Sequence, residues 1–340
     1  MKNYILQNEN GVYFECGYSC DNVIFLVFGS ERFFITDARY EIEAKNLAQD
    51  CEVVITNQLL NAAKELIKKH KIKNLHFDPS DFSVHSFETL SKDIKTNFVQ
   101  ELNFSKNKRI IKTPQEIKYI KKAMKLGREG FKRFGKFINE NGLYKSEKYL
   151  YFKAKEAMSN MGELDLSFDP IVAINQNSAK PHALPTSDVL HSGDLLLVDA
   201  GIKYKRYCSD RTCTSFVGDE FNFKRKQFFS KQEQQKVYDI VLKAQQKAIE
   251  KAKVGMKAKD IDKIARDVID KAGYGKYFVH STGHGVGLDI HEYPVINSKS
   301  ETIIEENMVF TIEPGIYLAQ NFGVRIEDTI AMIDGRGEIL

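Results

Sequence analysis

DLLLVDAGIKYKRYCSDRTCTSFV, residues 194–217, is the stretch of sequence that decides the fold. Two apolar runs flank a short polar segment, and this pattern predicts a β-hairpin. If Tyr204 and Lys205 form a two-residue turn, Asp199 lies directly opposite Asp210 on the same face of the sheet. Opposed carboxylates on a half-buried sheet repel each other, and a bound cation is the simplest compensation. Mn, Fe, Co or Zn would suit such oxygen ligands.

A second stretch, NMVFTIEPGIYLAQNFGVRIEDTIAMI (307–333), repeats this pattern. Glu313 and Glu327 would face each other in a hairpin centred on Gln320, although Pro314 interrupts strict pairing. Four acids in two opposed pairs exceed what one divalent ion needs. They fit a site for two ions with bridging carboxylates.

Helical signals precede both of these β-rich stretches. Capping boxes begin at Thr113 and at Ser230. We expect helices over residues 113–138, 146–159, 230–254 and 260–273. The order helix, helix, hairpin therefore occurs twice, which predicts two equivalent halves forming one sheet wrapped by helices, with a site between them. A single acid pair could instead reflect a misplaced turn or a partner such as Arg211, but two pairs in duplicated halves favour a metal site.

The first ~105 residues alternate short apolar runs with helical patterns, which predicts a small α/β domain. We expect strands at 22–28, 32–36, 51–56 and 73–78, and helices at 41–49 and 57–70. The polar segment before Thr113 marks a boundary, so we predict an N-terminal domain at 1–108 and a second domain at 109–340.

The stretch HSTGHGVGLDIHE (280–292) offers His280, His284 and His291 between glycines that keep the backbone slim near a ligand. Imidazole is the commonest nitrogen ligand for the metals named above. The stretch lacks both the G-x-G-x-x-G pattern and the lysine of a phosphate-binding loop, and no His-Glu-x-x-His is present. A histidine that supplements the four acids is the favoured interpretation.

The composition is that of a globular protein, with 42% hydrophobic and 28% charged residues among 340. Basic residues are spread along the chain at a net charge of +4, so nucleic acid is not an expected partner. Apolar runs fall far short of a membrane span and no signal peptide is recognisable, so we expect a cytoplasmic protein without a membrane anchor. The five cysteines match no zinc or disulfide pattern and are expected to be free thiols.

Together these segments resemble the pita-bread metallopeptidases, the group of aminopeptidase P, prolidase and methionine aminopeptidase. The motifs that carry the resemblance are VDAG…YCSDRT (198–212), HSTGHGVGLDIHE (280–292), TIEPG (311–315), GVRIEDT (323–329) and, more loosely, FITDARY (34–40). The resemblance implies an α+β fold. A duplicated pita-bread catalytic domain, with a curved antiparallel sheet covered by helices, would follow a smaller N-terminal α/β (creatinase-like) domain.

The resemblance also implies the roles of the five ligands. Asp199 would chelate one metal ion, His284 and Glu313 would bind the other, and Asp210 and Glu327 would bridge the two. Two divalent ions are expected, with Mn favoured and Co, Fe or Zn as alternatives. Glu313 would serve in addition as the general base and proton carrier.

Four outer residues match further positions of this group. His182, in KPHALP (180–185), would lie near the leaving side of the substrate, and His291 would contact the substrate carbonyl or amide. His280 and Arg325 would line a pocket for proline. Each histidine could instead be a surface or hydrogen-bonded structural residue, and Arg325 could simply pair with a nearby acid.

An N-terminal domain and this histidine set fit Xaa-Pro cleavage, by an Xaa-Pro aminopeptidase or an Xaa-Pro dipeptidase, better than a methionine-type aminopeptidase. The expected substrates are peptides with proline at the second position, and a homodimer is expected. A non-catalytic peptide-binding module would have lost metal ligands, and creatinase-type hydrolases lack this metal set.

One departure from the pattern concerns the residues after Asp210. Many relatives carry Thr-Arg-Thr there, whereas this chain has Cys213 between Thr212 and Thr214. Strand alternation places both threonines on the face of Asp210, and Arg211 and Cys213 on the other face. We expect Thr212 to support the site and Cys213 to be a packing residue rather than a nucleophile.

Overall fold

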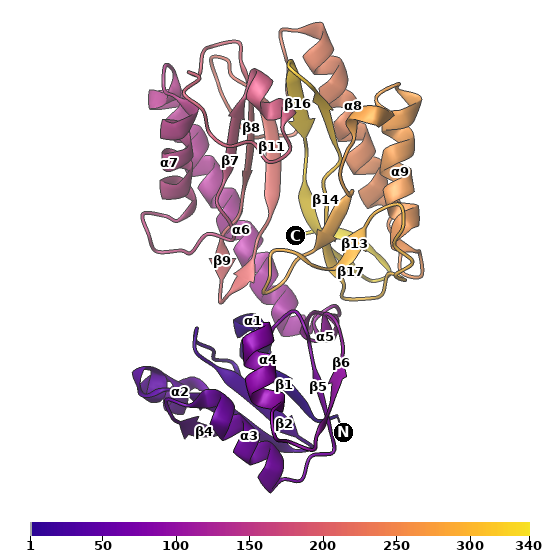
Figure 1. Cartoon of the computed structure of the whole chain (residues 1–340). Helices are drawn as coiled ribbons and strands as arrows, with labels where there is room; N and C mark the ends of the chain where they lie inside the picture. Colours follow the sequence, from indigo (N-terminus) through magenta and orange to yellow (C-terminus); the bar gives the residue numbers. More distant parts are fainter. Residues whose placement is uncertain (1) are drawn as a thin grey trace. The chain divides into compact units, whose positions relative to one another are not determined.

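The computed structural model describes residues 2–340 and divides into two compact units, Met1–Arg109 and Ile110–Leu340 (Figure 1). The N-terminal unit holds one six-stranded sheet in the order β4-β3-β2-β1-β5-β6. Its strands are β1 (Tyr4–Leu6), β2 (Ile24–Phe28), β3 (Glu31–Thr36), β4 (Glu52–Ile55), β5 (Asn74–Phe77) and β6 (Asn97–Gln100). Its helices are α1 (Glu9–Cys16), η1 (Ala38–Tyr40), α2 (Glu41–Leu47), α3 (Leu59–Lys69), α4 (Val84–Ser91) and α5 (Phe104–Lys108).

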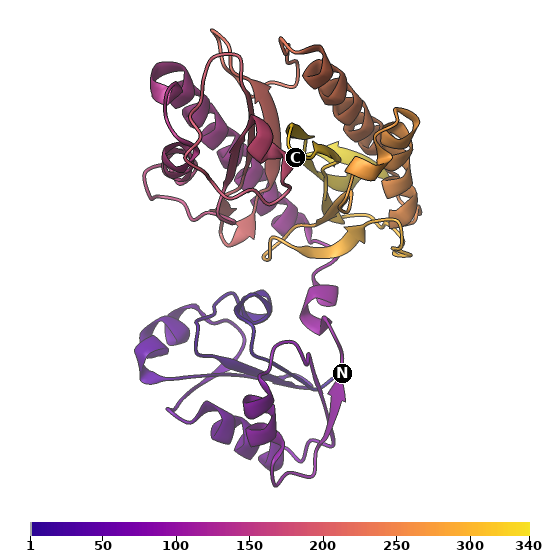
Figure 2. The same ribbon diagram turned by 45° about the horizontal axis from the view of Figure 1, so that its top comes forward.

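Helices cover both faces of this sheet (Figure 2). Alternate residues of β2 divide between two cores: Leu26 packs in the core that includes Leu59 of α3, and Phe25 packs in the core that includes Val12 of α1. A strand buried on both faces needs a continuous apolar run, and β2 is buried at all five positions. The strands and helices predicted here are confirmed, while β1, α1, α4, β6 and α5 were not predicted.

The C-terminal unit contains the predicted repeat of helix, helix and antiparallel strands. The first half holds α6 (Pro114–Phe137), η2 (Ile138–Gly142), α7 (Glu147–Met158), β7 (Ile171–Ile174), η3 (Asn175–Ala179), β8 (Leu195–Ala200), β9 (Lys203–Tyr204), β10 (Tyr207–Cys208) and β11 (Arg211–Phe216). The second half holds α8 (Gln232–Lys251), α9 (Ala258–Lys271), η4 (Gly275–Tyr277), β12 (Gly283–Gly285), β13 (Glu292–Ile296), β14 (Val309–Ile312), β15 (Gly315–Leu318), β16 (Phe322–Arg325), β17 (Asp328–Ile333) and β18 (Arg336–Ile339).

Each half of this unit has its own apolar core. One core joins α6 and α7 to β7, β8 and β11, and the other joins α8 and α9 to β14, β16 and β17. The strands therefore lie between two pairs of helices, as Figures 1 and 2 both show. The fold class is α+β, as predicted.

Helix starts were predicted with mixed success. The capping box at Thr113 is formed: the Thr113 hydroxyl accepts from the Glu116 amide, and the Glu116 carboxylate accepts from the Thr113 amide. The box predicted at Ser230 is wrong, because α8 begins only at Gln232 and the residue before it, Lys231, makes no capping bond with its side chain. The same helix ends at Lys251, three residues before the predicted end.

The first hairpin turns one residue later than predicted. Lys205 and Arg206 occupy the turn, with φ angles of 48° and 67°, while Tyr204 pairs with Tyr207. Two-residue turns with positive φ at both central positions usually carry Asn or Gly, so Lys-Arg gives no sequence signal for one.

This shift changes the partner of Asp199. In the β8–β11 ladder Asp199 pairs with Thr212, so the prediction that it lies directly opposite Asp210 is wrong. The pairing has moved by two residues, which preserves the face of every side chain in a strand of period two. Asp210 directly precedes β11, so the two acids still belong to the same part of the sheet.

The second hairpin has the predicted centre. Ile312 pairs with Asp328 in the β14–β17 ladder, and Gly315 pairs with Arg325 in the β15–β16 ladder, so both ladders are centred on Gln320. The ladder is interrupted at Pro314, as expected for a residue without an amide proton. Glu313 and Glu327 lie at this interruption, one on each strand.

The two halves meet along β11 and β16. The Glu327 amide donates to the Thr212 carbonyl at 3.1 Å, and the Thr214 hydroxyl donates to the Arg325 carbonyl at 2.8 Å. We call this contact between β11 and β16 the seam. Each half carries its acid pair next to the seam, so the packing of the two halves brings the two pairs together.

We expect Gly201→Ala to destabilise the protein, because a Cβ at this position would lie 1.9 Å from the Ser209 carbonyl oxygen, next to Asp210. The free energy of unfolding should fall by about 1–3 kcal/mol in thermal or urea unfolding. Gly135→Ala is the control, since its Cβ would meet Phe223 no closer than 3.6 Å and helix α6 should be unchanged or slightly stabilised. Equal stability of the Gly201→Ala variant and the wild type would contradict the close approach.

Candidate metal centre

Side chains from both halves converge at the seam. The five predicted ligands come from the end of β8, the start of β11, β12, the end of β14 and the start of β17; they are Asp199, Asp210, His284, Glu313 and Glu327. Ligand atoms of Asp210, His284 and Glu327 lie within 4.8 Å of one another. His284 Nε2 is 3.6 Å from Asp210 Oδ2 and 3.3 Å from Glu313 Oε1.

The ring of His284 is oriented for coordination through Nε2. Its Nδ1 lies 3.0 Å from the carbonyl oxygen of Gly285, which can only accept, so Nδ1 carries the proton. Burial lowers the pKa of His284, so the imidazole is neutral near pH 7. The lone pair on Nε2 is therefore free to face the carboxylates.

A β-bulge sets the position of His284. The register between β12 and β13 shifts between His284 and Gly285, and bulges of this kind re-aim side chains next to active sites. A Cβ at Gly283 would lie 1.9 Å from the Thr311 carbonyl oxygen, and one at Gly285 would lie 2.2 Å from the Tyr293 carbonyl oxygen. Glycine at these two positions therefore allows the backbones of the neighbouring strands to approach closely. This close approach explains the two glycines, whereas the sequence alone predicted that they leave the space that a ligand needs.

Threonine hydroxyls hold two of the carboxylates in place. Thr212 donates to Glu327 at 2.7 Å, as its predicted supporting role requires. Thr311 donates to Glu313 at 3.0 Å and accepts from the His284 amide at 3.1 Å, which links two of the predicted ligands. Partners of this kind fix the orientation of metal ligands.

The carboxylates repel one another in a buried site. Burial, followed by the charges of the neighbouring acids, raises the pKa of Asp210 and of Glu327 well above the usual range, and burial raises the pKa of Glu313. Oδ1 of Asp199 is buried without a hydrogen-bond partner. Clustered carboxylate oxygens and one neutral imidazole fit a divalent cation, which would relieve the repulsion and satisfy the unpartnered oxygen.

Arg325 is buried and its guanidinium contacts the site directly. Nη2 donates to Asp199 Oδ2 at 2.6 Å, Nε donates to the Thr212 hydroxyl at 3.1 Å, and Nη1 donates to the Tyr317 hydroxyl at 2.9 Å. The alternative that Arg325 pairs with a nearby acid is therefore realised in this structure. Its predicted role in a proline pocket stays a prediction.

Tyr317 is a member of the site that was not predicted from the sequence. Nδ1 of His280 lies 2.7 Å from the Ser281 carbonyl oxygen and so carries the ring proton, which leaves Nε2 to accept from the Tyr317 hydroxyl at 2.8 Å. Burial raises the pKa of Tyr317 to about 12, so the hydroxyl remains a donor at neutral pH. Residue alternation from Glu313 along β15 was the signal that could have indicated it.

The other two predicted histidines have exposed side chains. The ring of His291 lies 4.4 Å from that of His284, centroid to centroid. His182 lies in the segment between η3 and β8, and the carbonyl of the preceding residue, Pro181, accepts from Arg325 Nη1 at 3.2 Å. The structure thus places His291 beside a predicted ligand and the backbone next to His182 beside Arg325.

Strand alternation along β11 matches the prediction. Thr212 and Thr214 face the second half, whereas the guanidinium of Arg211 lies 5.6 Å from the ring centroid of Phe131 in α6. Cys213 packs in the core that joins α6 and α7 to the first half.

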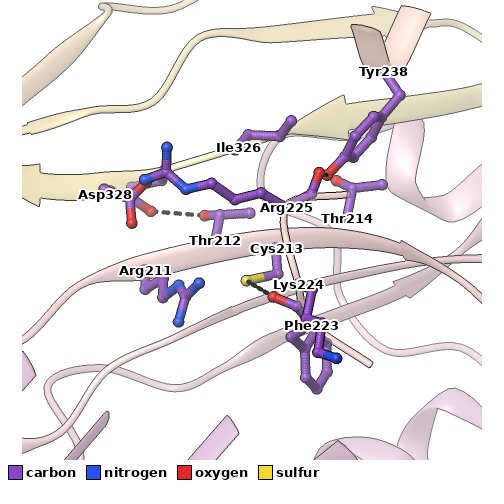
Figure 3. A pocket seen from close by; sticks show the side chains of 11 residues that line it. Arg211, Thr212, Cys213, Thr214, Phe223, Lys224, Arg225, Tyr238, Ile326 and Asp328 are labelled. Atoms are coloured by element: carbon purple, nitrogen blue, oxygen red, sulfur yellow. Dashed lines mark hydrogen bonds and ion pairs between the residues drawn. The ribbon is translucent and has the colours of Figure 1, made fainter. Parts of the chain in front are cut away.

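Asp328, the neighbour of Glu327, is held by a guanidinium and by a side-chain amide. Arg225, from the segment between β11 and α8, forms an ion pair with Asp328 (Figure 3). Gln245 of α8 donates to the same carboxylate at 2.6 Å. Burial raises the pKa of the Cys213 thiol to about 11, so it is protonated at neutral pH. These facts agree with the packing role expected for Cys213.

Comparisons with known proteins identify the family. The profile described as metallopeptidase family M24 matches residues 118–334, and the profile of the creatinase/prolidase N-terminal domain matches residues 1–111. The chain belongs to metallopeptidase family M24. It is therefore a peptidase of a family that uses divalent metal ions, and the resemblance seen in the sequence is confirmed.

Relatives of this M24 chain include proteins named for their substrates. An Xaa-Pro dipeptidase from Pyrococcus furiosus is 40% identical over 255 residues, which span 72% of this chain and 70% of the relative. The structure of an Xaa-Pro dipeptidase from Bacillus anthracis matches with a TM-score of 0.91 at 32% identity, covering 99% of this chain and 92% of the other. That of an X-Pro aminopeptidase from Thermotoga maritima matches with a TM-score of 0.87 at 30% identity, covering 100% and 95%. These matches confirm the predicted pita-bread fold with an N-terminal domain.

Within residues 2–340 of the M24 chain, no helix combines the length and the apolar character that a membrane crossing needs.

The metal-free protein should lose stability as the pH rises. Asp210 and Glu327 have raised pKa values when folded and ordinary values near 3.8 and 4.5 when unfolded, so the folded state binds more protons in the interval between them. The free energy of unfolding should therefore fall from about pH 4 toward neutral pH, by about 1.4 kcal/mol for each unit of raised pKa that is crossed.

Thermal unfolding in a chelating buffer across this range measures the effect. Glu327→Gln is the matched variant and should show a shallower pH dependence, since one of the repelling charges is gone. A metal-free protein whose stability rises toward pH 7 would contradict the electrostatic account of the site.

Proposed function

We propose that the chain is a dinuclear-metal exopeptidase that hydrolyses the bond between an N-terminal residue and a following proline. The observation that carries this proposal is the cluster of four carboxylates and one imidazole at the seam of the two halves, in which Asp210 and Glu327 are buried and the others are half-buried. The names of the relatives, Xaa-Pro dipeptidase and X-Pro aminopeptidase, support the substrate class.

The proposed ligand sets are those that the resemblance to the pita-bread metallopeptidases implies. Asp199 would hold one ion, His284 and Glu313 would hold the other, and Asp210 and Glu327 would be shared by both. When bound, the ions lower the pKa of water and polarise the scissile carbonyl. We propose Mn as the metal, with Co, Fe or Zn as alternatives, since carboxylate-rich sets suit these ions.

Glu313 is the proposed general base. A carboxylate oxygen of Glu313 takes the proton of the attacking water and returns it to the nitrogen of the leaving proline. The hydroxyl of Thr311 donates to Glu313 Oε1 at 3.0 Å, and Nε2 of the His284 ring lies 3.3 Å from the same oxygen. The group is therefore fixed while its proton moves.

The outer residues are proposed to bind the substrate. His291 contacts the scissile carbonyl or amide, and His182 lies at the leaving side. His280 and Arg325, joined through the Tyr317 hydroxyl, line the pocket for the proline ring. Because Arg325 also pairs with Asp199, this pocket is tied to a metal ligand.

The proposal predicts metal-dependent hydrolysis of Xaa-Pro peptides. Metal-free protein should be inactive, and added Mn should restore the release of the N-terminal residue from an Xaa-Pro dipeptide, a longer Xaa-Pro peptide, or both. An Xaa-Ala dipeptide serves as the substrate control. Activity on the dipeptide alone selects a dipeptidase, and activity on the longer peptide selects an aminopeptidase. Full metal occupancy with no hydrolysis of either Xaa-Pro substrate would refute the proposal.

Asp210→Ala should abolish both metal binding and turnover. We expect kcat/KM to fall by more than about 100-fold, because even residues that only support a ligand are worth 10- to 100-fold. Calorimetric titration with Mn and steady-state assays check the two effects. Asp267→Ala, which removes an exposed carboxylate paired with Lys263 on α9, is the charge-matched control. Turnover retained by the Asp210→Ala variant would rule out the bridging role.

The expected homodimer stays a prediction, which light scattering of the purified protein would check.

A further inference from the structure

Glu147, the first residue of α7, is a carboxylate with no exposed surface. It lies in the first half, outside the ligand cluster and outside every motif that the sequence analysis used. A buried carboxylate is costly unless hydrogen bonds compensate for the lost water. The hydrogen-bond donors to this carboxylate identify the segment of the chain that Glu147 fixes in place.

Three N–H donors converge on this carboxylate. The amide of Ile174 donates to Oε1 at 2.6 Å, while the Asn177 side chain and the amide of Thr186 donate to Oε2 at 2.8 and 2.7 Å. The position at the start of a helix favours the negative charge as well. Hydrogen bonds to an ionised acceptor are stronger than those between neutral groups, so this arrangement is a firm anchor.

The three donors belong to a single segment, residues 174–186, which we call the His182 loop. Ile174 and Thr186 stand at its two ends, and Asn177 also donates to the carbonyl of Leu184 at 2.9 Å within it. Glu147 therefore closes the loop at its base. A loop clamped at both ends by one side chain has few conformations left for the residues between them.

The tip of the His182 loop is tied to the metal centre. The Ser178 hydroxyl donates to the Gly323 carbonyl at 3.1 Å and accepts from the Gly323 amide at 2.8 Å. The carbonyl of Pro181 accepts from Arg325 Nη1 at 3.2 Å. His182 thus lies between an anchor at the base of the loop and contacts to β16, while its own side chain is exposed.

We propose that Glu147 is a positioning residue for the peptidase reaction, acting through His182. It holds the loop so that the His182 ring meets the leaving side of the substrate. This inference rests on the proposed function, because His182 has its role only there. Misplacing a substrate-contacting group by about 1 Å can reduce the rate 100-fold, so the anchor matters for catalysis as well as for stability.

Glu147→Gln tests the inference. The amide keeps the shape of the side chain but turns one oxygen into a donor that faces an N–H, so at least one bond is lost. We expect kcat/KM on an Xaa-Pro dipeptide to fall by about 10- to 100-fold. Mn affinity should be unchanged, since none of the three donors belongs to a predicted ligand. Hydrogen exchange of the amides of residues 174–186 should become faster.

A double-mutant cycle separates positioning from general destabilisation. In a His182→Ala background, Glu147→Gln should cause no further loss of kcat/KM beyond about 2-fold. Ser146→Ala is the control for stability, since it removes the capping hydroxyl of the same helix without touching the carboxylate. It should lower the melting temperature and leave kcat/KM unchanged.

Asn177→Ala is the milder variant should Glu147→Gln fail to fold, and its effect should likewise vanish in the His182→Ala background. An equal loss in both backgrounds, or faster exchange of the loop with unchanged kcat/KM, would overturn the positioning role alone. Wild-type protein that is loaded with metal but inactive on Xaa-Pro peptides would instead overturn the proposed function.

Discussion

Repulsion among buried carboxylates is the constraint on which the C-terminal unit depends. Asp210 and Glu327 lie almost without solvent contact, and each raises the cost of ionising the other. Such a cluster persists only where the surrounding structure fixes it. Here the fixing elements are two separately cored halves that meet along β11 and β16, with hydroxyls of Thr212 and Thr311 directed at the acids.

The duplicated fold accounts for the two pairs of carboxylates, whereas the single imidazole comes from a feature that only the second half has. Each half places one acid on each strand of a hairpin, but only the second half adds a histidine, on the bulged strand β12. The ion pair of Arg225 and Asp328 is a second feature that the strands of the hairpins do not supply on their own. The guanidinium that accompanies the acid next to Glu327 comes from a connecting segment, while the strand position 213 holds a buried thiol.

The residues of the candidate site could be identified from the sequence because their signals are residue types in repeated patterns, which survive an error of register. The turn at Lys205 and Arg206 shows this: its left-handed pair carries no sequence signal, yet a shift of two residues left Asp199 on its face. The start of α8 could not be read from Ser230, because a capping box is a local preference that tertiary packing overrides.

Groups that act through tertiary contacts were harder to recognise from the sequence. Strand alternation could have indicated Tyr317, but its contact with His280 depends on the fold. Glu147 carries no sequence signal for its contacts with the His182 loop. The strand β1 was missed because its three residues are too few to show a period.

The glycines on either side of His284 have a consequence for judging distant relatives. Carbonyl oxygens of neighbouring strands fill the space that a side chain at Gly283 or Gly285 would need. A relative could therefore keep all five proposed ligands and still lose the arrangement of the site through one methyl group at either position. An inventory of ligands alone would count such a protein as an enzyme, so the two backbone positions belong among the criteria that separate working members from degenerate copies.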